Sequence, residues 1–408
     1  MNCGLLGRKL GHSYSPQIHQ HFGDYSYRLF EKEPEDIADF ILNGDFNGIN
    51  VTIPYKKDVL PFCSELSDTA KKLGAVNTIV RKKDGRIVGH NTDYFGFMSM
   101  VKKSGLHVAG KKVLILGSGG ASATAQAVLK ELHANFVVIS RMGENNYQNL
   151  DLHSDASLII NCTPVGMYPN PGVSPIDISL FPMLEGVLDM IYNPARTKLL
   201  MDAEQRNLIS MNGLWMLVAQ AKESAEWFME KKLDDSIIEA VYQFLISQMH
   251  NIILVGMPGC GKSTVGKLLS KKLNKQFVDA DEEICTFSNR TIPEIFQNDG
   301  EATFRSIETE VLCKLGMKSG IVLATGGGCV TKDRNYPLLH QNGTIVWIQR
   351  DLSKLDKKGR PLSSVTTAEE MFAHRRPMYE RFADLTVENN GEPKETVSRI
   401  IQLLGAKL

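Results

Sequence analysis

The chain has 408 residues, which suggests roughly two or three domains, and its content of 43% hydrophobic and 23% charged residues is ordinary for a globular protein. Its 46 lysines and arginines balance 46 aspartates and glutamates, which argues against a nucleic-acid or membrane-surface partner. The 7 cysteines include no Cys-x-x-Cys pair, so the sequence indicates neither a disulfide framework nor a structural zinc site. Because it shows no signal peptide and no apolar run of membrane-spanning length, we expect a cytoplasmic protein.

The first predicted strand, residues 2–7, precedes a segment rich in hydroxyl groups. Residues 11–16 read GHSYSP and lead into a helix that begins near Pro16. Ser13 and Ser15 stand at this helix entrance, where hydroxyl and amide groups together can bind a carboxylate. The alternative is that one serine caps the helix and the other stabilises the turn.

Further polar residues follow predicted strand ends. The strand at residues 46–52 ends at Thr52, and Lys56 comes soon after it, at the edge where α/β sheets place their ligands. Asn77 and Asp93 stand in the segments AVNT and GHNTD, which also lie at strand or loop ends. A single lysine at such a place is usually a solvated helix-start residue, so these residues indicate a polar site only as a set.

The second quarter has the pattern of a dinucleotide-binding βαβ unit. Residues 112–116 and 135–140 predict strands, and residues 117–133 predict a glycine-rich turn followed by a helix. The helix N-terminus would receive a pyrophosphate. The turn consists of Gly117, Ser118, Gly119, Gly120 and Ala121, followed by Ser122.

The end of the second strand of this unit bears on the choice of cofactor. NAD enzymes place an acid there to hold the ribose 2′-hydroxyl, but this chain has Ser140-Arg141 and no acid before Glu144. A cation at this point favours the 2′-phosphate of NADP. The alternative is that Arg141 is a solvent-facing loop residue.

A phosphate loop occurs far into the chain, at residues 256–263. A strand at residues 252–255 runs directly into Gly-x4-Gly-Lys-Ser, and an amphipathic helix follows. Lys262 would reach the outer phosphates of ATP, and Ser263 would ligate Mg²⁺. The predicted ATP contacts in this loop are Gly259, Cys260, Gly261, Lys262, Ser263 and Thr264. Such a loop normally opens a domain, so we predict that two functional units join near residue 249.

Two carboxylates follow the phosphate loop. Residues 277–281 predict a strand end on which Asp279 and Asp281 face the same way. Because like charges repel, this arrangement suits one carboxylate near Mg²⁺ and one on a substrate. The alternative is a pair of helix-capping acids. Later segments are GEATFR at 300–305, GGG at 326–328, RPL at 360–362 and RRPMY at 375–379.

Residues 1–248 closely resemble the shikimate dehydrogenase family. The shared segments are HSYSP, NVTIPYK, GAVNT, GHNTD, NCTPVGM at 161–167 and NGLWMLVAQA at 212–221. The resemblance implies NADPH-dependent reduction of 3-dehydroshikimate, with Ser13 and Ser15 on the substrate carboxylate and Lys56 and Asp93 as the catalytic pair. The implied substrate pocket also contains Thr52, Asn77 and Gln220.

The same resemblance implies a set of NADP contacts. Besides the glycine-rich turn, they are Ser140, Arg141, Thr163 and Gly213. The family often carries a second basic residue a few positions after the arginine, and this chain reads Ser-Arg-Met-Gly-Glu-Asn-Asn instead. A weaker NADP preference than usual is therefore expected.

Residues 250–408 closely resemble shikimate kinase. The resemblance implies that shikimate is bound by Asp281, Arg305, Gly327 and Arg375, with the arginines on its carboxylate. Asp281 would also orient or deprotonate the attacking hydroxyl. Asp279 would assist in holding Mg²⁺, and Arg360 would close over the phosphates from a mobile lid. The adenine contacts are unassigned.

We therefore expect an α/β protein: a dehydrogenase with an α/β substrate lobe and a Rossmann NADP lobe, then a P-loop kinase with a five-stranded parallel sheet. The expected domains are residues 1–105, completed by helices of 213–248, then 106–212, then 249–408. The predicted function is reduction of 3-dehydroshikimate to shikimate and phosphorylation of shikimate. The alternative is a quinate/shikimate dehydrogenase that uses NAD, joined to a degenerate regulatory nucleotide-binding domain. The sequence leaves the oligomeric state open, with a homodimer as one alternative.

Overall fold

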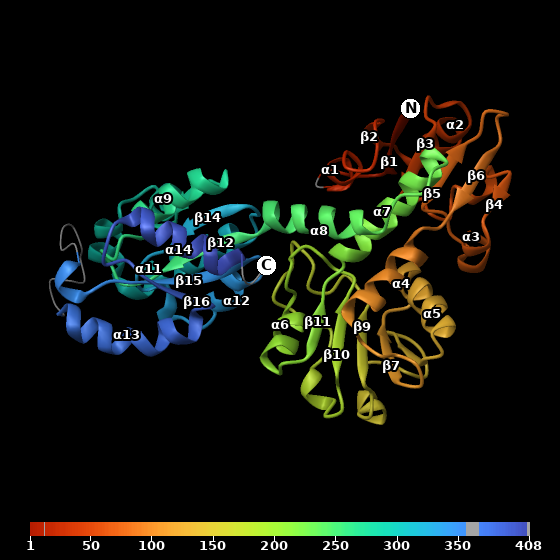
Figure 1. Cartoon of the computed structure of the whole chain (residues 1–408). Helices are drawn as coiled ribbons and strands as arrows, with labels where there is room; N and C mark the ends of the chain where they lie inside the picture. The colour runs from red at the N-terminus through yellow and green to blue at the C-terminus, as the bar shows by residue number, and fades with distance from the viewer. Residues whose placement is uncertain (12, 356–366, 406–408) are drawn as a thin grey trace. The chain divides into compact units, whose positions relative to one another are not determined.

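The computed structural model describes residues 1–11, 13–355 and 367–405, and the chain divides into two compact units, Met1–Tyr242 and Gln243–Leu408. Figure 1 shows their helices and strands. The division falls inside helix α8 (Ser236–Met249), whereas the sequence places the junction near residue 249. Arg360 lies outside the described residues.

The first sheet of the first unit is mixed, with the order β2-β1-β3-β5-β6-β4. Its central strands β3, β5 and β6 pair antiparallel, and this pairing places Asn50 beside Thr78 and Thr78 beside His90. Polar residues from three strand ends thus come together. The strands are β1 (Asn2–Gly7), β2 (Ser26–Glu31), β3 (Gly48–Val51), β4 (Glu65–Leu66), β5 (Thr78–Arg81) and β6 (Ile87–His90). The helices are α1 (Ser15–His19), α2 (Ile37–Asn43), α3 (Asp68–Leu73) and α4 (Asp93–Ser104).

The second sheet is fully parallel, with the order β11-β10-β9-β7-β8. The residues of β9 and β10 are all buried, as the continuous apolar runs of a doubly wound sheet require. The strands are β7 (Lys112–Leu116), β8 (Asn135–Ile139), β9 (Leu158–Asn161), β10 (Gly186–Asp189) and β11 (Ile209–Met211). The helices are α5 (Gly120–Glu131) and α6 (Lys198–Gln205).

Helix α7 (Leu214–Met229) follows this sheet and returns to the first one. It packs along α4 and contacts α1, β3 and β5. Two glycines allow this close approach. A Cβ at Gly96 would lie 2.7 Å from the Met216 carbonyl oxygen, and one at Gly48 would lie 2.2 Å from the Phe228 ring.

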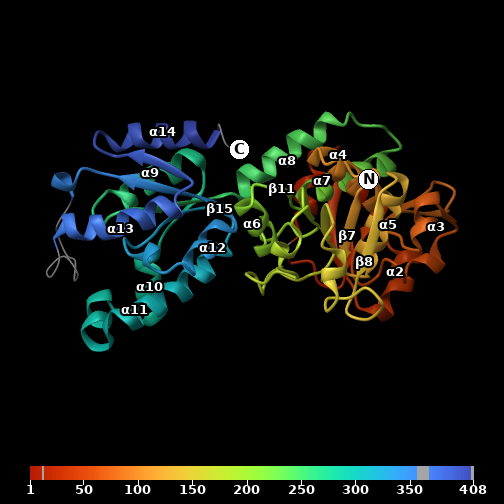
Figure 2. The ribbon, with the colours of Figure 1, turned by 90° about the horizontal axis from the view of Figure 1, so that it is seen from below.

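The second unit contains the expected five-stranded parallel sheet, with the order β13-β14-β12-β15-β16. Figure 2 shows α14 beside α9, and the two helices are in contact. The strands are β12 (Asn251–Val255), β13 (Gln276–Asp279), β14 (Ile321–Ala324), β15 (Gly343–Gln349) and β16 (Leu385–Glu388). The helices are α9 (Lys262–Leu273), α10 (Ala280–Ser288), α11 (Ile292–Gly316), α12 (Asn335–His340), α13 (Ala368–Phe382) and α14 (Pro393–Gly405).

One local prediction in this unit is wrong. Strand β13 ends at Asp279, and Asp281 lies in the first turn of α10, so the two carboxylates do not share one face of a strand. Asp279 caps this helix, because its Oδ1 accepts a hydrogen bond from the Asp281 N–H at 3.1 Å. The unpaired amides at a helix N-terminus favour such a cap over another residue of strand.

Candidate functional site

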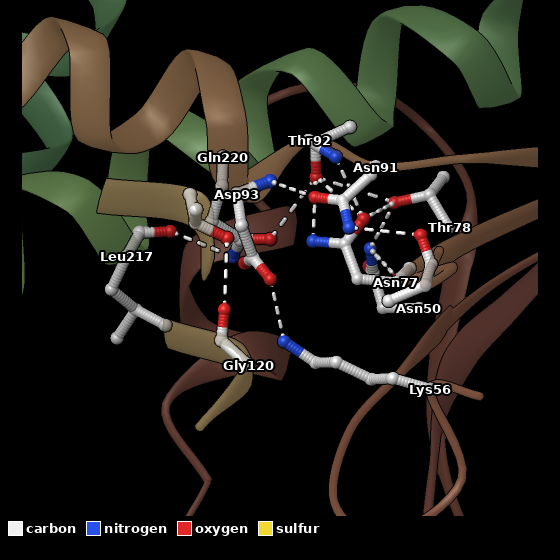
Figure 3. Close-up of polar contacts among 12 residues, drawn as sticks. Asn50, Lys56, Asn77, Thr78, Asn91, Thr92, Asp93, Gly120, Leu217 and Gln220 are labelled. Carbon is white, nitrogen blue, oxygen red and sulfur yellow. Dashed lines mark hydrogen bonds and ion pairs between the residues drawn. The ribbon is translucent and has the colours of Figure 1, made fainter. Parts of the chain in front are cut away.

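Lys56 and Asp93 form an ion pair in the first unit, as Figure 3 shows. Lys56 lies after β3, and Asp93 is the first residue of α4, where the helix dipole favours a carboxylate. Lys56 Nζ lies 2.6 Å from Asp93 Oδ2. The side chains are 31% and 17% exposed, so the pair is shielded but open to a small molecule.

A group of amides and hydroxyls lies beside this pair (Figure 3). Asn77 Oδ1 accepts hydrogen bonds from the Thr92 N–H at 2.8 Å and from the Thr78 hydroxyl at 3.1 Å. Gln220 Nε2 donates to the Leu217 carbonyl at 2.8 Å, and Gln220 Oε1 lies 3.4 Å from the Thr92 hydroxyl. The structure therefore brings Asn77 and Gln220 together through Thr92.

The two serines at the entrance of α1 contact each other. The Ser13 hydroxyl donates to the Ser15 hydroxyl at 3.1 Å and accepts from the Ser15 N–H at 3.2 Å. Ser15 is also a hydrogen-bond partner of the Tyr27 hydroxyl, which donates to Asn50 Oδ1 at 2.8 Å. Burial raises the pKa of Tyr27 well above its usual value, so this hydroxyl keeps its proton. Thr52 follows β3, and its N–H donates to the Leu6 carbonyl at 2.9 Å.

Sequence reasoning missed two residues on α7 near this group. Burial raises the pKa of Glu223 to about 7, with Asp93 among the carboxylates that raise it further. Ser224 is fully buried among the amides and hydroxyls. The helical spacing from Gln220 is the signal that would have found both, because residues three and four positions later share its face.

The glycine-rich turn of the second sheet has the form that a pyrophosphate requires. Gly117 has φ +100°, and a Cβ there would lie 3.0 Å from Thr163 Cγ2. The next four residues of the turn are not buried, and Gly119 caps α5 without a side-chain hydrogen bond. The N–H groups of this helix end can therefore face an anion.

The other residues expected to contact NADP differ in exposure, hydrogen bonding and packing. Arg141 is exposed, and the Ser140 hydroxyl donates to the Met142 carbonyl. The Thr163 hydroxyl donates to Asn161 Oδ1 at 2.7 Å. Gly213 caps α7, and a Cβ there would lie 2.2 Å from the Met190 carbonyl oxygen, so close packing at this position requires glycine.

The phosphate loop joins β12 to α9. Gly256, Gly259 and Gly261 have φ values of +146°, +81° and +98°, a region that side chains rarely adopt. Lys262 Nζ donates to the carbonyls of Gly256 and Met257 at 2.9 and 3.1 Å. Cys260 is fully buried as a space-filling residue, and Thr264 lies exposed in the first turn of α9.

Ser263 and Asp279 meet beside the loop. The Ser263 hydroxyl donates to Asp279 Oδ2 at 2.7 Å. A hydroxyl and a carboxylate are the hard oxygen ligands that Mg²⁺ takes at phosphate sites, so this pair fits the expected cation. Among the described residues, no group of three or more His, Cys, Asp or Glu side chains could hold a metal ion alone.

A buried charge cluster lies under the glycines that follow β14. Arg305 NH1 lies 2.8 Å from Glu308 Oε2, and these side chains are 5% and 1% exposed. Burial raises the pKa of Glu308, and Asp281 raises it further while Arg305 opposes the shift. A Cβ at Gly326 would lie 3.0 Å from Asp281 Oδ1 and 2.8 Å from Glu308 Oε1.

Arg375 reaches the same cluster from α13. It is buried, and its NH1 donates to the Gly327 carbonyl at 3.3 Å. A Cβ at Gly328 would lie 2.1 Å from Arg305 NH2. The structure thus brings together the four residues expected to bind the kinase substrate, Asp281, Arg305, Gly327 and Arg375.

The fold and these groups define two classes of enzyme unit. A doubly wound sheet with a glycine-rich turn and a Lys–Asp pair is the architecture of a dinucleotide-dependent oxidoreductase, and a phosphate loop with a buried arginine cluster is that of a small-molecule kinase. The shikimate dehydrogenase substrate binding domain matches residues 5–79, and shikimate kinase matches residues 258–405. The chain belongs to the shikimate dehydrogenase family and carries a shikimate kinase domain in addition.

Individual relatives agree with this assignment. A shikimate dehydrogenase (NADP(+)) of Clostridium beijerinckii is 34% identical over 262 residues, covering 59% of this chain and 96% of the relative. The structure of shikimate 5-dehydrogenase from Thermus thermophilus in complex with NADP(H) and shikimate is similar with a TM-score of 0.54 and 28% identity, covering 60% of this chain and 99% of that one. The structure of a quinate dehydrogenase from Corynebacterium glutamicum in complex with NAD is similar with a TM-score of 0.54 and 26% identity, covering 60% of this chain and 99% of that one.

Within residues 1–11, 13–355 and 367–405, no helix has both the length and the apolar character needed to span a bilayer.

Proposed function

We propose that the first unit reduces 3-dehydroshikimate to shikimate with NADPH and that the second unit phosphorylates shikimate with ATP. The observation that carries the first step is the Lys56–Asp93 pair at 2.6 Å beside Asn77 and Gln220. The phosphate loop and the cluster around Arg305 support the second. The hydroxyl made by the reduction would be the nucleophile of the phosphorylation, so one metabolite connects the two units.

In the reduction, the chain's residues would position the ketone and protonate it. The glycine-rich turn and Arg141 would hold NADPH, which would supply a hydride for the carbonyl carbon. Negative charge then develops on the carbonyl oxygen, and the Lys56 ammonium donates a proton to it. Asp93 orients Lys56 and accepts a hydrogen bond from a neighbouring ring hydroxyl, while Ser13 and Ser15 hold the carboxylate.

In the phosphorylation, Asp281 would orient the shikimate hydroxyl and accept its proton. Arg305 and Arg375 would hold the carboxylate, since a guanidinium matches it with two hydrogen bonds. Lys262 would leave the loop carbonyls and contact the outer phosphates of ATP. Ser263 and Asp279 would hold Mg²⁺, which neutralises phosphate charge.

The test is one assay with the full chain. NADPH oxidation is followed with 3-dehydroshikimate, and products are separated with and without ATP. We expect shikimate without ATP and shikimate 3-phosphate with it. Absence of NADPH oxidation would overturn the first assignment, and shikimate that accumulates in the presence of ATP would overturn the second.

A second candidate for the first unit is an NAD-dependent quinate/shikimate dehydrogenase. The similarity to a quinate dehydrogenase in complex with NAD favours it, as does the exposed position of Arg141 without a second nearby cation in the sequence. A panel of NADPH and NADH, each with 3-dehydroshikimate and 3-dehydroquinate, separates the two. We expect the highest kcat/KM with NADPH and 3-dehydroshikimate.

A further inference from the structure

Ser224 lies where four elements of the substrate lobe meet. It is fully buried on α7, one turn after Gln220. Its Oγ is 2.7 Å from Asn50 Nδ2, 2.9 Å from the Thr78 hydroxyl, 3.0 Å from the Thr92 hydroxyl and 2.9 Å from the Gln220 backbone oxygen. One hydroxyl group thus contacts β3, β5, the residue before α4, and α7.

The contacts of Thr92 determine which way the Asn77 amide faces. The Thr92 backbone N–H, which can only donate, lies 2.8 Å from one terminal atom of Asn77, so that atom is the oxygen. The nitrogen of the amide donates one hydrogen to the Thr92 hydroxyl at 3.0 Å. The second amide hydrogen is what Asn77 can offer to a substrate oxygen.

Ser224 serves as a hydrogen-bond acceptor for the other elements. Because its single proton goes to the Gln220 carbonyl, its lone pairs accept from Asn50 Nδ2 and from the hydroxyl of either Thr78 or Thr92. The other of these two hydroxyls then has Asn77 Oδ1 as its acceptor, at 3.1 Å from Thr78 and 3.2 Å from Thr92. No side-chain nitrogen or oxygen of these residues is buried without a partner.

We propose that Ser224 is a positioning residue of the dehydrogenase site, one that couples the Asn77 amide, a donor to a ring hydroxyl of the substrate, to the α7 turn bearing Gln220. The proton of that hydroxyl then points to an acceptor, and Asp93 supplies one. This inference rests on the proposed function, because it assumes that Asn77 and Gln220 bind the dehydrogenase substrate.

The test is the kinetics of Ser224→Ala in the full chain. Removing the hydroxyl deprives Asn50 of its shortest contact and takes away an acceptor that the Thr78 and Thr92 hydroxyls share. We expect KM for 3-dehydroshikimate to rise about tenfold, the effect of one buried hydrogen bond, while KM for NADPH stays within about twofold. The control is Ser104→Ala on α4, whose hydroxyl hydrogen-bonds with the backbone at Val101 and Leu106. It should change neither constant.

A double-mutant cycle separates positioning from a general structural role. In an Asn77→Ala background, Ser224→Ala should raise KM less than about twofold, because the amide that it positions is gone. The same fold increase in both backgrounds, or an unchanged KM in the single variant, would overturn the inference. If Ser224→Ala fails to fold, Ser224→Cys keeps the side-chain volume, removes the strong donor and carries the same test.

These outcomes are distinct from failure of the proposed function. A wild-type chain that does not oxidise NADPH with 3-dehydroshikimate overturns the proposed function and this inference with it. An active wild type with normal kinetics in the Ser224 variants overturns this inference alone.

Discussion

Lys56 and Asp93 are 37 positions apart in the sequence, yet Lys56 Nζ lies 2.6 Å from Asp93 Oδ2. The lysine belongs to the loop after β3 and the aspartate to the start of α4. An ammonium that is held by a carboxylate and is still 31% exposed is placed to donate a proton to a bound ketone.

Lys56→Ala should therefore lower kcat of the dehydrogenase by about 10²–10⁴-fold, the usual contribution of a positioned proton donor. Phosphorylation of shikimate by the same preparation should be unchanged. The neighbouring exposed Lys57 is the matched control, and Lys57→Ala should keep full activity in both assays. A Lys56→Ala variant with near-normal kcat would remove this residue from the chemistry.

Arg141→Ala tests cofactor recognition. If the guanidinium contacts the 2′-phosphate, its loss should raise KM for NADPH by about tenfold or more and leave KM for NADH within about twofold, since an ion pair to phosphate is lost only with NADPH. Initial rates with both cofactors measure this. Equal increases in KM for NADPH and NADH would mean that Arg141 has a structural role and does not select between the two cofactors.

Lys262→Ala should abolish phosphoryl transfer, because this ammonium is the loop's only side-chain cation for the outer phosphates. Dehydrogenase activity should persist. The exposed Lys272, near the end of the same helix, serves as the control, and Lys272→Ala should phosphorylate shikimate normally. Retained kinase activity in Lys262→Ala would argue against this loop as the ATP site.

Asp281→Asn should spare ATP binding and lose turnover of shikimate by about 10²-fold or more, since an amide cannot accept the hydroxyl proton. Fluorescent-nucleotide titration and a coupled ADP assay measure the two effects. Glu282→Gln, an exposed neighbour in the same helical turn, should have no effect on either. Normal phosphorylation by Asp281→Asn would show that the kinase site is misassigned.

The raised pKa of Glu223 predicts that the stability of the folded chain depends on pH. Burial raises its pKa from 4.5 to about 7; Glu226 and Asp93 add to this shift, and Lys232 and Lys222 oppose it. Between pH 4.5 and about pH 7, the native state therefore keeps a proton on Glu223 that the unfolded state has lost. The folded state is stabilised by this proton below pH 4.5, and that stabilisation is lost as the pH rises to about 7.

The measurement is the difference in Tm between wild type and Glu223→Gln across about pH 4 to 8. Because the glutamine cannot ionise, we expect wild type to lose stability relative to the variant as pH rises from about 4.5 to about 7, with no further change above that. The exposed Glu35 is the control, and Glu35→Gln should show a flat difference. A flat difference for Glu223→Gln would contradict this assignment.

Much of the fold could be predicted from local patterns. The strands β1, β7 and β12 occupy the predicted residues to within one position, because an apolar run between turn residues favours a buried strand wherever it is placed. The phosphate loop was predictable for a similar reason, since the positive φ values of Gly256, Gly259 and Gly261 are a property of glycine itself.

Local patterns were less reliable where two local structures compete. Asp281 was predicted on a strand, with its side chain on the same face as that of Asp279. It lies in α10 instead, because Asp279 caps the helix and ends the strand two residues earlier. Capping and strand extension differ by little in free energy, so neighbouring elements decide between them.

The partners of the site residues come from tertiary packing alone. Ser224 hydrogen-bonds with Thr78, 146 positions earlier, and with Thr92, 132 positions earlier. A sequence pattern fixes which side chains share a helix face or a strand face, but not which faces meet. The packing of α7 against α4, which Gly96 permits, brings a buried serine and a carboxylate with a raised pKa to the candidate site.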